Sequence, residues 1–157
     1  MLFRSRLKLP LGENMQFVQN LVRLHLRPIS LAYEVTDSAI RRLLFEAGDD
    51  VDSLMLLCRA DITSKNVEKV TRFLRNFDAV EERMKEVEAK DHIRNFQPPV
   101  SGEEIMTTFG IGPGRIIGVI KDAIKDAILE GVIRNNREEA WELMLKIAAE
   151  NGLIIKS

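Results

Sequence analysis

Apolar side chains recur along almost the whole chain at intervals of three and four residues, which is the spacing of one face of an α-helix. No segment of useful length alternates apolar and polar residues as a half-buried strand does. The pattern therefore predicts an all-α protein, a multi-helix bundle of about six to seven helices. The predicted helical segments are 15–26, 40–47, 51–58, 67–91, 101–109, 116–128 and 137–150.

Residues that start and stop helices flank these segments. Thr36 or Asp37 is placed to cap the second segment, and Gly48 to end it. Ser101 with Glu104 fits a capping box. The remaining boundary residues are Asp49 or Asp50 before the third segment, Asn135 or Asn136 before the last, and Gly131 and Gly152 as stops.

The best internal boundary is the Gln97-Pro98-Pro99 sequence, because proline disfavours helix at the residue before it. It divides the chain into a helical unit, residues 1–96, and a C-terminal helical subdomain, residues 97–157. The second unit contains a Gly-rich turn at residues 110–114 between two helical segments, which predicts a helix-turn-helix.

Composition restricts the classes of function. The chain has 157 residues and a net charge of -1, with acids and bases interleaved, whereas a nucleic-acid binder that acts alone is usually basic. Cys58 is the single cysteine, so an internal disulfide and a multi-cysteine zinc site are excluded. No stretch is long and apolar enough for a membrane span, and no signal-peptide pattern opens the chain. We expect a cytoplasmic protein.

Several segments, in their order along the chain, resemble the second half of the HD domain and the helical tail of bacterial tRNA nucleotidyltransferases, the CCA-adding enzymes of the poly(A) polymerase family. They are Arg6-Leu-Lys-Leu-Pro10, Leu24-His-Leu-Arg-Pro-Ile29, Val35-Thr-Asp-Ser-Ala-Ile-Arg-Arg-Leu-Leu44, Cys58-Arg-Ala-Asp-Ile-Thr-Ser-Lys-Asn66, Glu86-Val-Glu-Ala-Lys-Asp91, Arg94-Asn-Phe-Gln-Pro-Pro-Val100, Gly102-Glu-Glu-Ile-Met106, and the Gly-rich turn with its Ile-rich helix.

The resemblance implies a supporting role rather than catalysis. In that family an upstream head adds cytidine and adenosine to the tRNA 3′ end with nucleoside triphosphates and Mg²⁺, and the helical C-terminal regions help to hold the tRNA elbow. The head and the adjacent His-Asp pair of the HD domain would precede this chain. We therefore expect a non-catalytic fragment without a cofactor of its own, whose partners are tRNA and upstream domains of the same protein.

By the same resemblance, His25 and Asp61 fall on residual metal-binding positions of the HD domain. The chain has only two histidines and no His-Asp dipeptide, so we expect His25 to be structural and Asp61 to cap or pair. The Asp50-Val-Asp52 sequence lacks the preceding Gly-Ser turn of a nucleotidyltransferase metal site. We interpret its acids as favourable charges at a helix start.

The Gly-rich turn provides the main candidate RNA contact. Glycines at the start of a helix leave backbone N–H groups accessible to a phosphate. Gly114, Gly118, Lys121 and Lys125 share one helical face, and the candidate residues are Gly112, Gly114, Arg115, Lys121 and Lys125. The alternative is a packing role for the glycines and pairing of the lysines with Asp122 and Asp126.

Further basic candidates are Arg27, Arg41, Arg42 and Lys65, which could contact RNA or an upstream domain. For the two adjacent arginines the alternative is internal pairing with Glu34, Asp37 or Glu46.

Two other classes of function stay open, a fragment of an HD-type metal-dependent phosphohydrolase and a helical protein-interaction module. If the first half of an HD domain is missing, the apolar stripe of residues 15–26 lacks its partner. We expect an exposed apolar face there, and possible self-association through it.

Overall fold

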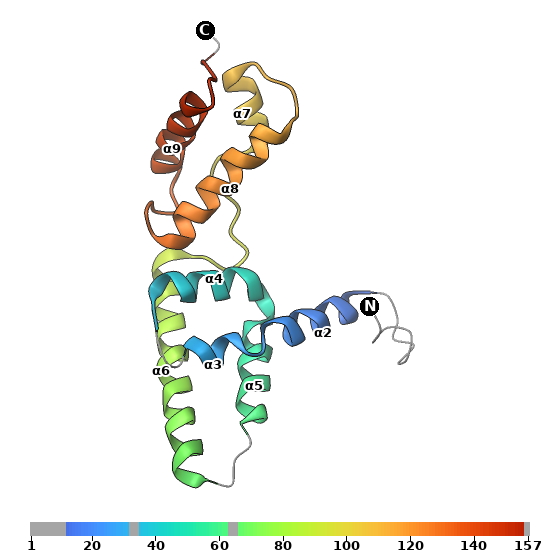
Figure 1. Cartoon of the computed structure of the whole chain (residues 1–157), viewed down its shortest axis with the longest axis vertical. Helices are drawn as coiled ribbons and strands as arrows, with labels where there is room; N and C mark the ends of the chain where they lie inside the picture. Colours follow the sequence, from blue (N-terminus) through green and yellow to red (C-terminus); the bar gives the residue numbers. More distant parts are fainter. Residues whose placement is uncertain (1–11, 32–34, 63–65, 156–157) are drawn as a thin grey trace.

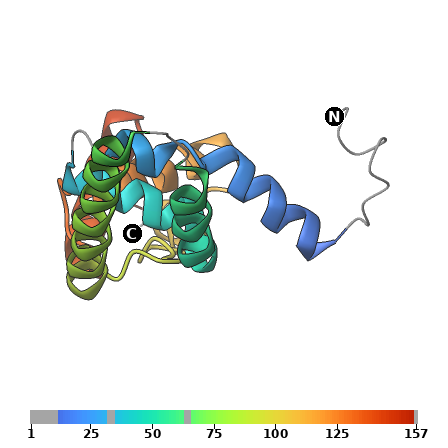
Figure 2. The same ribbon diagram turned by 90° about the horizontal axis from the view of Figure 1, so that it is seen from below.

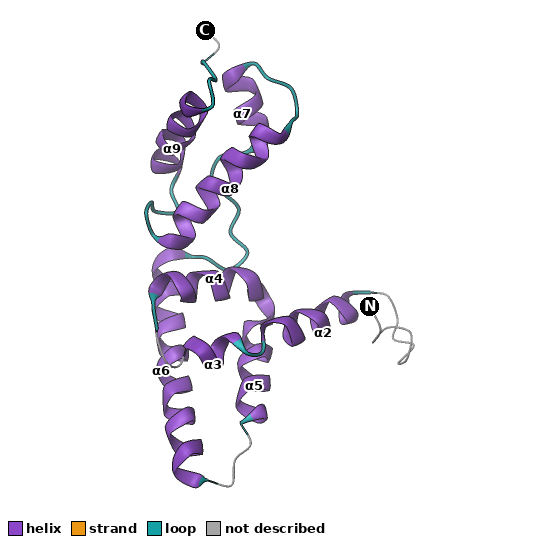
Figure 3. Cartoon of the chain, in the orientation of Figure 1, coloured by secondary structure: helices purple, strands orange, loops and turns teal. Residues whose placement is uncertain are grey.

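The protein is described by a computed structural model that covers residues 12–31, 35–62 and 66–155. Every regular element in these ranges is a helix, which confirms the predicted all-α class (Figure 3). The elements are α2 (Glu13–Leu24), α3 (Arg27–Leu31), α4 (Asp37–Ala47), the short 3-10 helix η1 (Gly48–Asp50), α5 (Val51–Asp61), α6 (Val67–Asp91), α7 (Gly102–Phe109), α8 (Arg115–Glu130) and α9 (Arg137–Glu150).

Helix α4 lies at the centre of the molecule (Figure 1). It packs against α3, α5 and α6 on one side and against α8 on the other, and α8 in turn packs against α7 and α9. Its apolar side chains Ile40, Leu43, Leu44 and Ala47 are all buried. These buried side chains, spaced with the 3.6-residue period of a helix, therefore connect the two ends of an elongated molecule.

The segment between α6 and α7 is irregular but firmly packed. Ile93 and Val100 are completely buried, and the Phe96 ring lies 5.2 Å from the Phe45 ring of α4. The hydrophobic core runs without interruption from Leu24 to Ala148. The proline-containing boundary predicted near residue 97 thus falls in a segment that contributes side chains to the common core.

Most predicted helix boundaries are confirmed. The Thr36 hydroxyl accepts a hydrogen bond from the Ala39 N–H, Asn136 caps α9 in the same way, and Ser101 forms the capping box with Glu104. Gly48 ends α4, and Gly110 and Gly131 end α7 and α8 with positive φ angles. Positive φ is the conformation that glycine adopts at little cost.

The helix predicted over residues 15–26 is present as α2 but ends two residues early. α2 ends at Leu24, and the chain starts the short helix α3 at Arg27. Proline explains the break, since Pro28 has no N–H to donate to the carbonyl of Leu24 four residues earlier. The proline side chain is buried, so the break is also held by packing.

Helix α2 extends away from the body of the molecule (Figures 1 and 2). Leu24 is buried and Leu21 is packed against the core, whereas Val18, Val22 and Leu26 are 44%, 63% and 61% exposed. The expected exposed apolar stripe is therefore present, on α2 and at Leu26 just after it. No helix among the described residues is long and apolar enough to cross a membrane.

Candidate nucleic-acid interface

His25, one of the two candidate metal ligands, lies between α2 and α3 and contacts its own helix and α5. The Nδ1 atom of His25 lies 2.6 Å from the Val22 carbonyl oxygen, and the His25 carbonyl accepts a hydrogen bond from the Cys58 thiol. Asp61, the other candidate, is exposed at the end of α5 and makes no hydrogen bond or ion pair with another described residue, so it does not have the expected capping or pairing contact. In the part of the chain that the structure describes, no three His, Cys, Asp or Glu side chains gather as they would around a metal ion.

The thiol of Cys58 is enclosed by this packing. Its side chain is fully buried, and burial raises its pKa to about 11, with a smaller contribution from the nearby charge of Asp61. A thiol with such a pKa is protonated at neutral pH and a poor nucleophile. Cys58 is therefore part of the core.

Asp50 and Asp52 lie at the start of α5, as expected from the sequence. Asp50 stands at the N-cap of α5 but its side chain accepts no capping hydrogen bond. Asp52 lies in the first turn, 3.9 Å from the Arg94 guanidinium, and Asp49 accepts a hydrogen bond from the Asn95 amide. These acids act through charge at the start of the helix and through contacts with the segment after α6.

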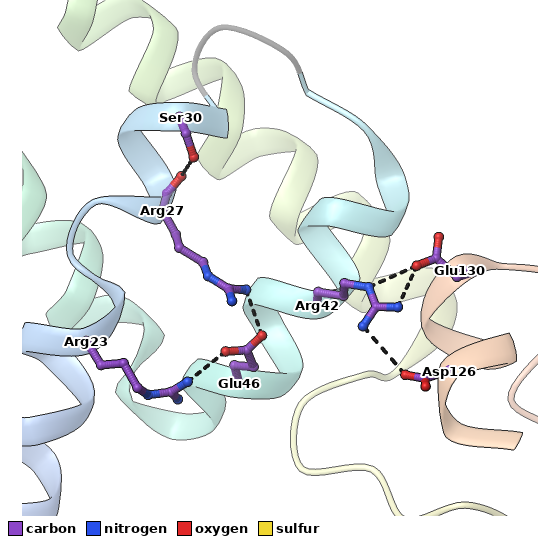
Figure 4. Close-up of polar contacts among 7 residues, drawn as sticks. All are labelled: Arg23, Arg27, Ser30, Arg42, Glu46, Asp126 and Glu130. Atoms are coloured by element: carbon purple, nitrogen blue, oxygen red, sulfur yellow. Dashed lines mark hydrogen bonds and ion pairs between the residues drawn. The ribbon is translucent and has the colours of Figure 1, made fainter. Parts of the chain in front are cut away.

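Three of the basic candidates are ion-paired within the chain. Arg27 and Arg23 both reach Glu46 on α4, and Arg42 reaches from α4 to Glu130 and Asp126 on α8 (Figure 4). Arg41 donates from Nε to Asp91 at 2.7 Å, and both side chains are largely buried.

Internal pairing of Arg41 and Arg42 is the alternative that the sequence suggested, but the observed partners differ from those expected. They lie on α6 and α8 rather than at Asp37 or Glu46, while Glu34 is outside the described residues, as is the candidate Lys65. Arg41 and Arg42 thus hold α4 to its neighbours.

The Gly-rich turn is open to solvent. Gly112 and Gly114 are exposed, and a Cβ atom added at Gly112 would meet no other atom within 4 Å. Gly114 is the N-cap of α8 and provides no side chain to accept from the first-turn N–H groups. The first turn of α8 contains no acid, like that of the five-residue α3, whereas α4, α5, α6, α7 and α9 each have at least one there.

The cations beside this turn differ in their availability. Arg115 and Lys121 make no ion pair with any described residue, although the charge of Lys121 contributes to lowering the pKa of Asp122. Lys125 donates to Asp122 at 2.7 Å, and this hydrogen bond is the largest cause of that lowered pKa. Gly118 lies between Arg115 and Lys121, and a Cβ there would meet only open space.

Arg115 belongs to a small minority among the described arginines. Arg72, Arg75 and Arg115 lack an ion pair, whereas all the other described arginines have one. Arg72 and Arg75 lie on the exposed N-terminal half of α6, at the opposite end of the molecule from α7 (Figure 1). Helical spacing alone does not show which arginines will find a partner, so these two could not be identified from the sequence.

The turn is supported from α9. Arg137 of α9 donates to Glu104 of α7, and its guanidinium lies 5.3 Å from the Trp141 ring centre. The bond from Arg137 and the capping contact with Ser101 lower the pKa of Glu104 to about 2. These contacts hold α7 against α9, so the turn that follows α7 begins at a helix whose position is fixed.

Comparison of the chain with protein-family models, with curated proteins and with solved structures found no match.

Proposed function

We propose that this chain is a non-catalytic helical unit of a tRNA nucleotidyltransferase that binds the phosphate backbone of tRNA through the turn between α7 and α8. The observation that carries the proposal is the pair of unpaired cations, Arg115 and Lys121, beside a glycine turn with no side chain over it. The choice of tRNA as the ligand, and of CCA addition as the activity of the parent enzyme, rests on the segments that resemble the C-terminal regions of CCA-adding enzymes.

The physical argument concerns the cost of placing a cation at this position. The N-terminal end of a helix carries partial positive charge, so an arginine in the first turn is unfavourable by a few tenths of a kcal/mol. An RNA phosphate bound at this position would be attracted both by the arginine and by the positive end of the helix. It would also accept hydrogen bonds from the first-turn N–H groups of α8. Exposed Gly114 and Gly118 allow a backbone to approach closely.

The set of RNA-binding residues is therefore narrower than the sequence suggests. We retain Gly112, Gly114, Arg115 and Lys121, and assign Lys125 a secondary role because Asp122 already neutralises it. Arg27, Arg41 and Arg42 hold helices together and are not part of the proposed contact.

A tRNA titration at low salt tests this function. The variant is Arg115→Glu with Lys121→Glu, and the control is Arg72→Glu with Lys69→Glu, an equal charge change on exposed residues of α6. We expect the α8 variant to weaken binding at least about tenfold, as for loss of two charge-assisted phosphate contacts, and the control to change it little. Equal losses in both variants would show non-specific attraction and contradict the proposal.

A second candidate is a protein-interaction module, which the exposed apolar side chains of α2 favour. Phe17, Val18 and Val22 of α2, which leaves the body of the molecule, are all more than a third exposed, as is Leu26 just after this helix. Contiguous exposed apolar surface marks interaction sites in many proteins. The two candidates use different surfaces and can be tested separately.

A further inference from the structure

The C-terminal end of α9 carries the single Asn-Gly dipeptide of the chain, Asn151-Gly152. Every other asparagine is followed by a residue with a side chain, which shields the backbone nitrogen next to the asparagine amide. Both residues of the dipeptide are exposed, and a Cβ atom at Gly152 would meet no other atom within 4 Å. The backbone nitrogen of Gly152 is therefore the least hindered one that follows an asparagine here.

Asparagine is among the chemically labile residues of proteins, and an Asn-Gly sequence can lose its side-chain amide without an enzyme. The Gly152 nitrogen gives its proton to hydroxide and attacks Cγ of Asn151. The new N–Cγ bond closes a succinimide ring, the Cγ–Nδ2 bond breaks, and ammonia leaves with a proton from water. A second water molecule then adds to either ring carbonyl and opens the ring to aspartate or to isoaspartate. The reaction needs no oxidant or reductant.

The folded structure holds both reacting groups away from this reaction. Nδ2 of Asn151 donates to the Ile147 carbonyl oxygen at 2.8 Å, and the Gly152 N–H donates to the Ala149 carbonyl oxygen at 3.0 Å. The succinimide ring also keeps Cβ and the Gly152 nitrogen nearly eclipsed about the Cα–C bond, which the observed ψ angle of 11° at Asn151 does not allow. Ring closure therefore requires the last turn of α9 to open.

Few contacts hold this last turn closed. Helix ends open more readily than helix centres, because fewer bonds and less buried surface are lost. Among the described residues after Gly152, only Leu153 packs against the core, and its N–H donates to the Ala148 carbonyl oxygen at 2.9 Å. Ile154 and Ile155 are 84% and 56% exposed. The packing of Leu153 is therefore the main resistance to opening.

We propose that Asn151 deamidates spontaneously in the native protein, at a rate set by opening of the last turn of α9. The product holds this end less firmly than asparagine does, because the donor to the Ile147 carbonyl is lost. The new carboxylate also stands at the C-terminal end of a helix, where the partial charge of the backbone is negative, and next to the exposed Glu150. The modification is independent of the proposed tRNA contact.

Incubation of the folded protein in mildly alkaline buffer, followed by tryptic digestion and mass spectrometry, tests the site. The peptide 147–156 contains Asn151 as its only side-chain amide. We expect it to show the mass increase from amide to acid, as two products of equal mass that chromatography separates. The rate should rise with pH, because the attacking nitrogen must lose its proton. Asn151→Gln keeps an amide but needs a larger ring, and should lose the mass increase.

Two further variants test the control by the last turn and the consequence of the reaction. Leu153→Ala should raise the rate by about fivefold or more, whereas Ile133→Ala, at another partly buried residue that precedes α9, should leave it unchanged. Asn151→Asp, which is one of the products, should lower the melting temperature by about 2–4 °C. No mass increase in wild type, equal rates in the two alanine variants, or an unchanged melting temperature of Asn151→Asp would overturn the proposal.

Discussion

At the scale of single residues, the glycines of α8 and its C-terminal end have opposite roles. Gly131 has φ +75°, and a Cβ there would lie 2.6 Å from Nη1 of Arg41, which is itself held by Asp91. Gly118 lies inside α8 with open space where its Cβ would be.

We therefore expect Gly131→Ala to destabilise the protein by about 1–3 kcal/mol, from backbone strain and displacement of Arg41. Gly118→Ala should instead stabilise it by about 0.5–1 kcal/mol, because alanine favours helix. Urea denaturation of both variants measures the two effects. A stabilising Gly131→Ala substitution would contradict the observed approach of Arg41 to the backbone.

Glu104 gives the molecule a pH-dependent contact. Its pKa of about 2 lies below the ordinary value of 4.5, mainly because Arg137 donates to it. A carboxyl with a lowered folded-state pKa contributes stability above its unfolded-state pKa, and loses that contribution as pH falls through the folded-state value.

Wild type should therefore be more stable than Glu104→Gln near pH 6, and the difference should shrink between about pH 4.5 and pH 2. Glutamine is a suitable control because it can keep the capping hydrogen bond while removing the charge. Thermal unfolding of both proteins across this range measures the difference. Parallel stability profiles would show that the Glu104–Arg137 pair contributes nothing.

At the scale of helices, the two adjacent arginines of α4 should differ in their effect. The Arg41–Asp91 pair is 11% and 20% exposed, whereas Arg42 and Glu130 are 38% and 46% exposed. Solvent weakens the exposed pair, while removal of Arg41 leaves a largely buried carboxylate without its partner.

Arg41→Ala should accordingly cost about 2 kcal/mol in the free energy of unfolding, and Arg42→Ala less than about 1 kcal/mol. Both values come from chemical denaturation, and adding salt should reduce only the smaller one appreciably. An equal cost for both substitutions would mean that burial does not govern these pairs.

The sequence predicts those features of the helices that depend on near neighbours. The Ser101–Glu104 capping box and the stop at Gly110 involve residues a few positions apart, and both are present as predicted. The turn between α7 and α8 could also be located from the sequence, because Gly112, Gly114 and Arg115 lie within four residues of one another. The packed face of α2, in contrast, does not follow from near neighbours. Leu21 and Leu24 contact the core because of how α2 meets α4 and α5.

The partners of distant residues could not be predicted in this way. Arg41 and Asp91 are 50 residues apart, and Arg42 and Glu130 are 88 residues apart. Their pairing depends on how α4 lies against α6 and α8, which hydrophobic periodicity does not specify.

At the scale of the whole molecule, α2 is the element that the rest of the chain covers least. We expect wild type to self-associate through Phe17, Val18 and Val22 at high concentration. Val18→Lys with Val22→Lys should give a monomer and change stability by less than about 0.5 kcal/mol, because both positions are exposed.

Leu24→Ala is the contrasting variant, because Leu24 is 1% exposed. This substitution should lower the free energy of unfolding by about 2–5 kcal/mol. Sedimentation velocity gives the assembly state, and denaturation gives the stabilities. A wild-type protein that stays monomeric at the highest accessible concentration would argue against a role for α2 in self-association.

The central claim is that Arg115 and Lys121 contact RNA phosphates. The most direct test is the salt dependence of tRNA affinity for wild type and for Arg115→Ala with Lys121→Ala. Each phosphate contact releases bound counterions, so the slope of log affinity against log salt should be smaller in the variant by about two units. Identical slopes would contradict the claim, because they would show that neither side chain contacts the RNA backbone.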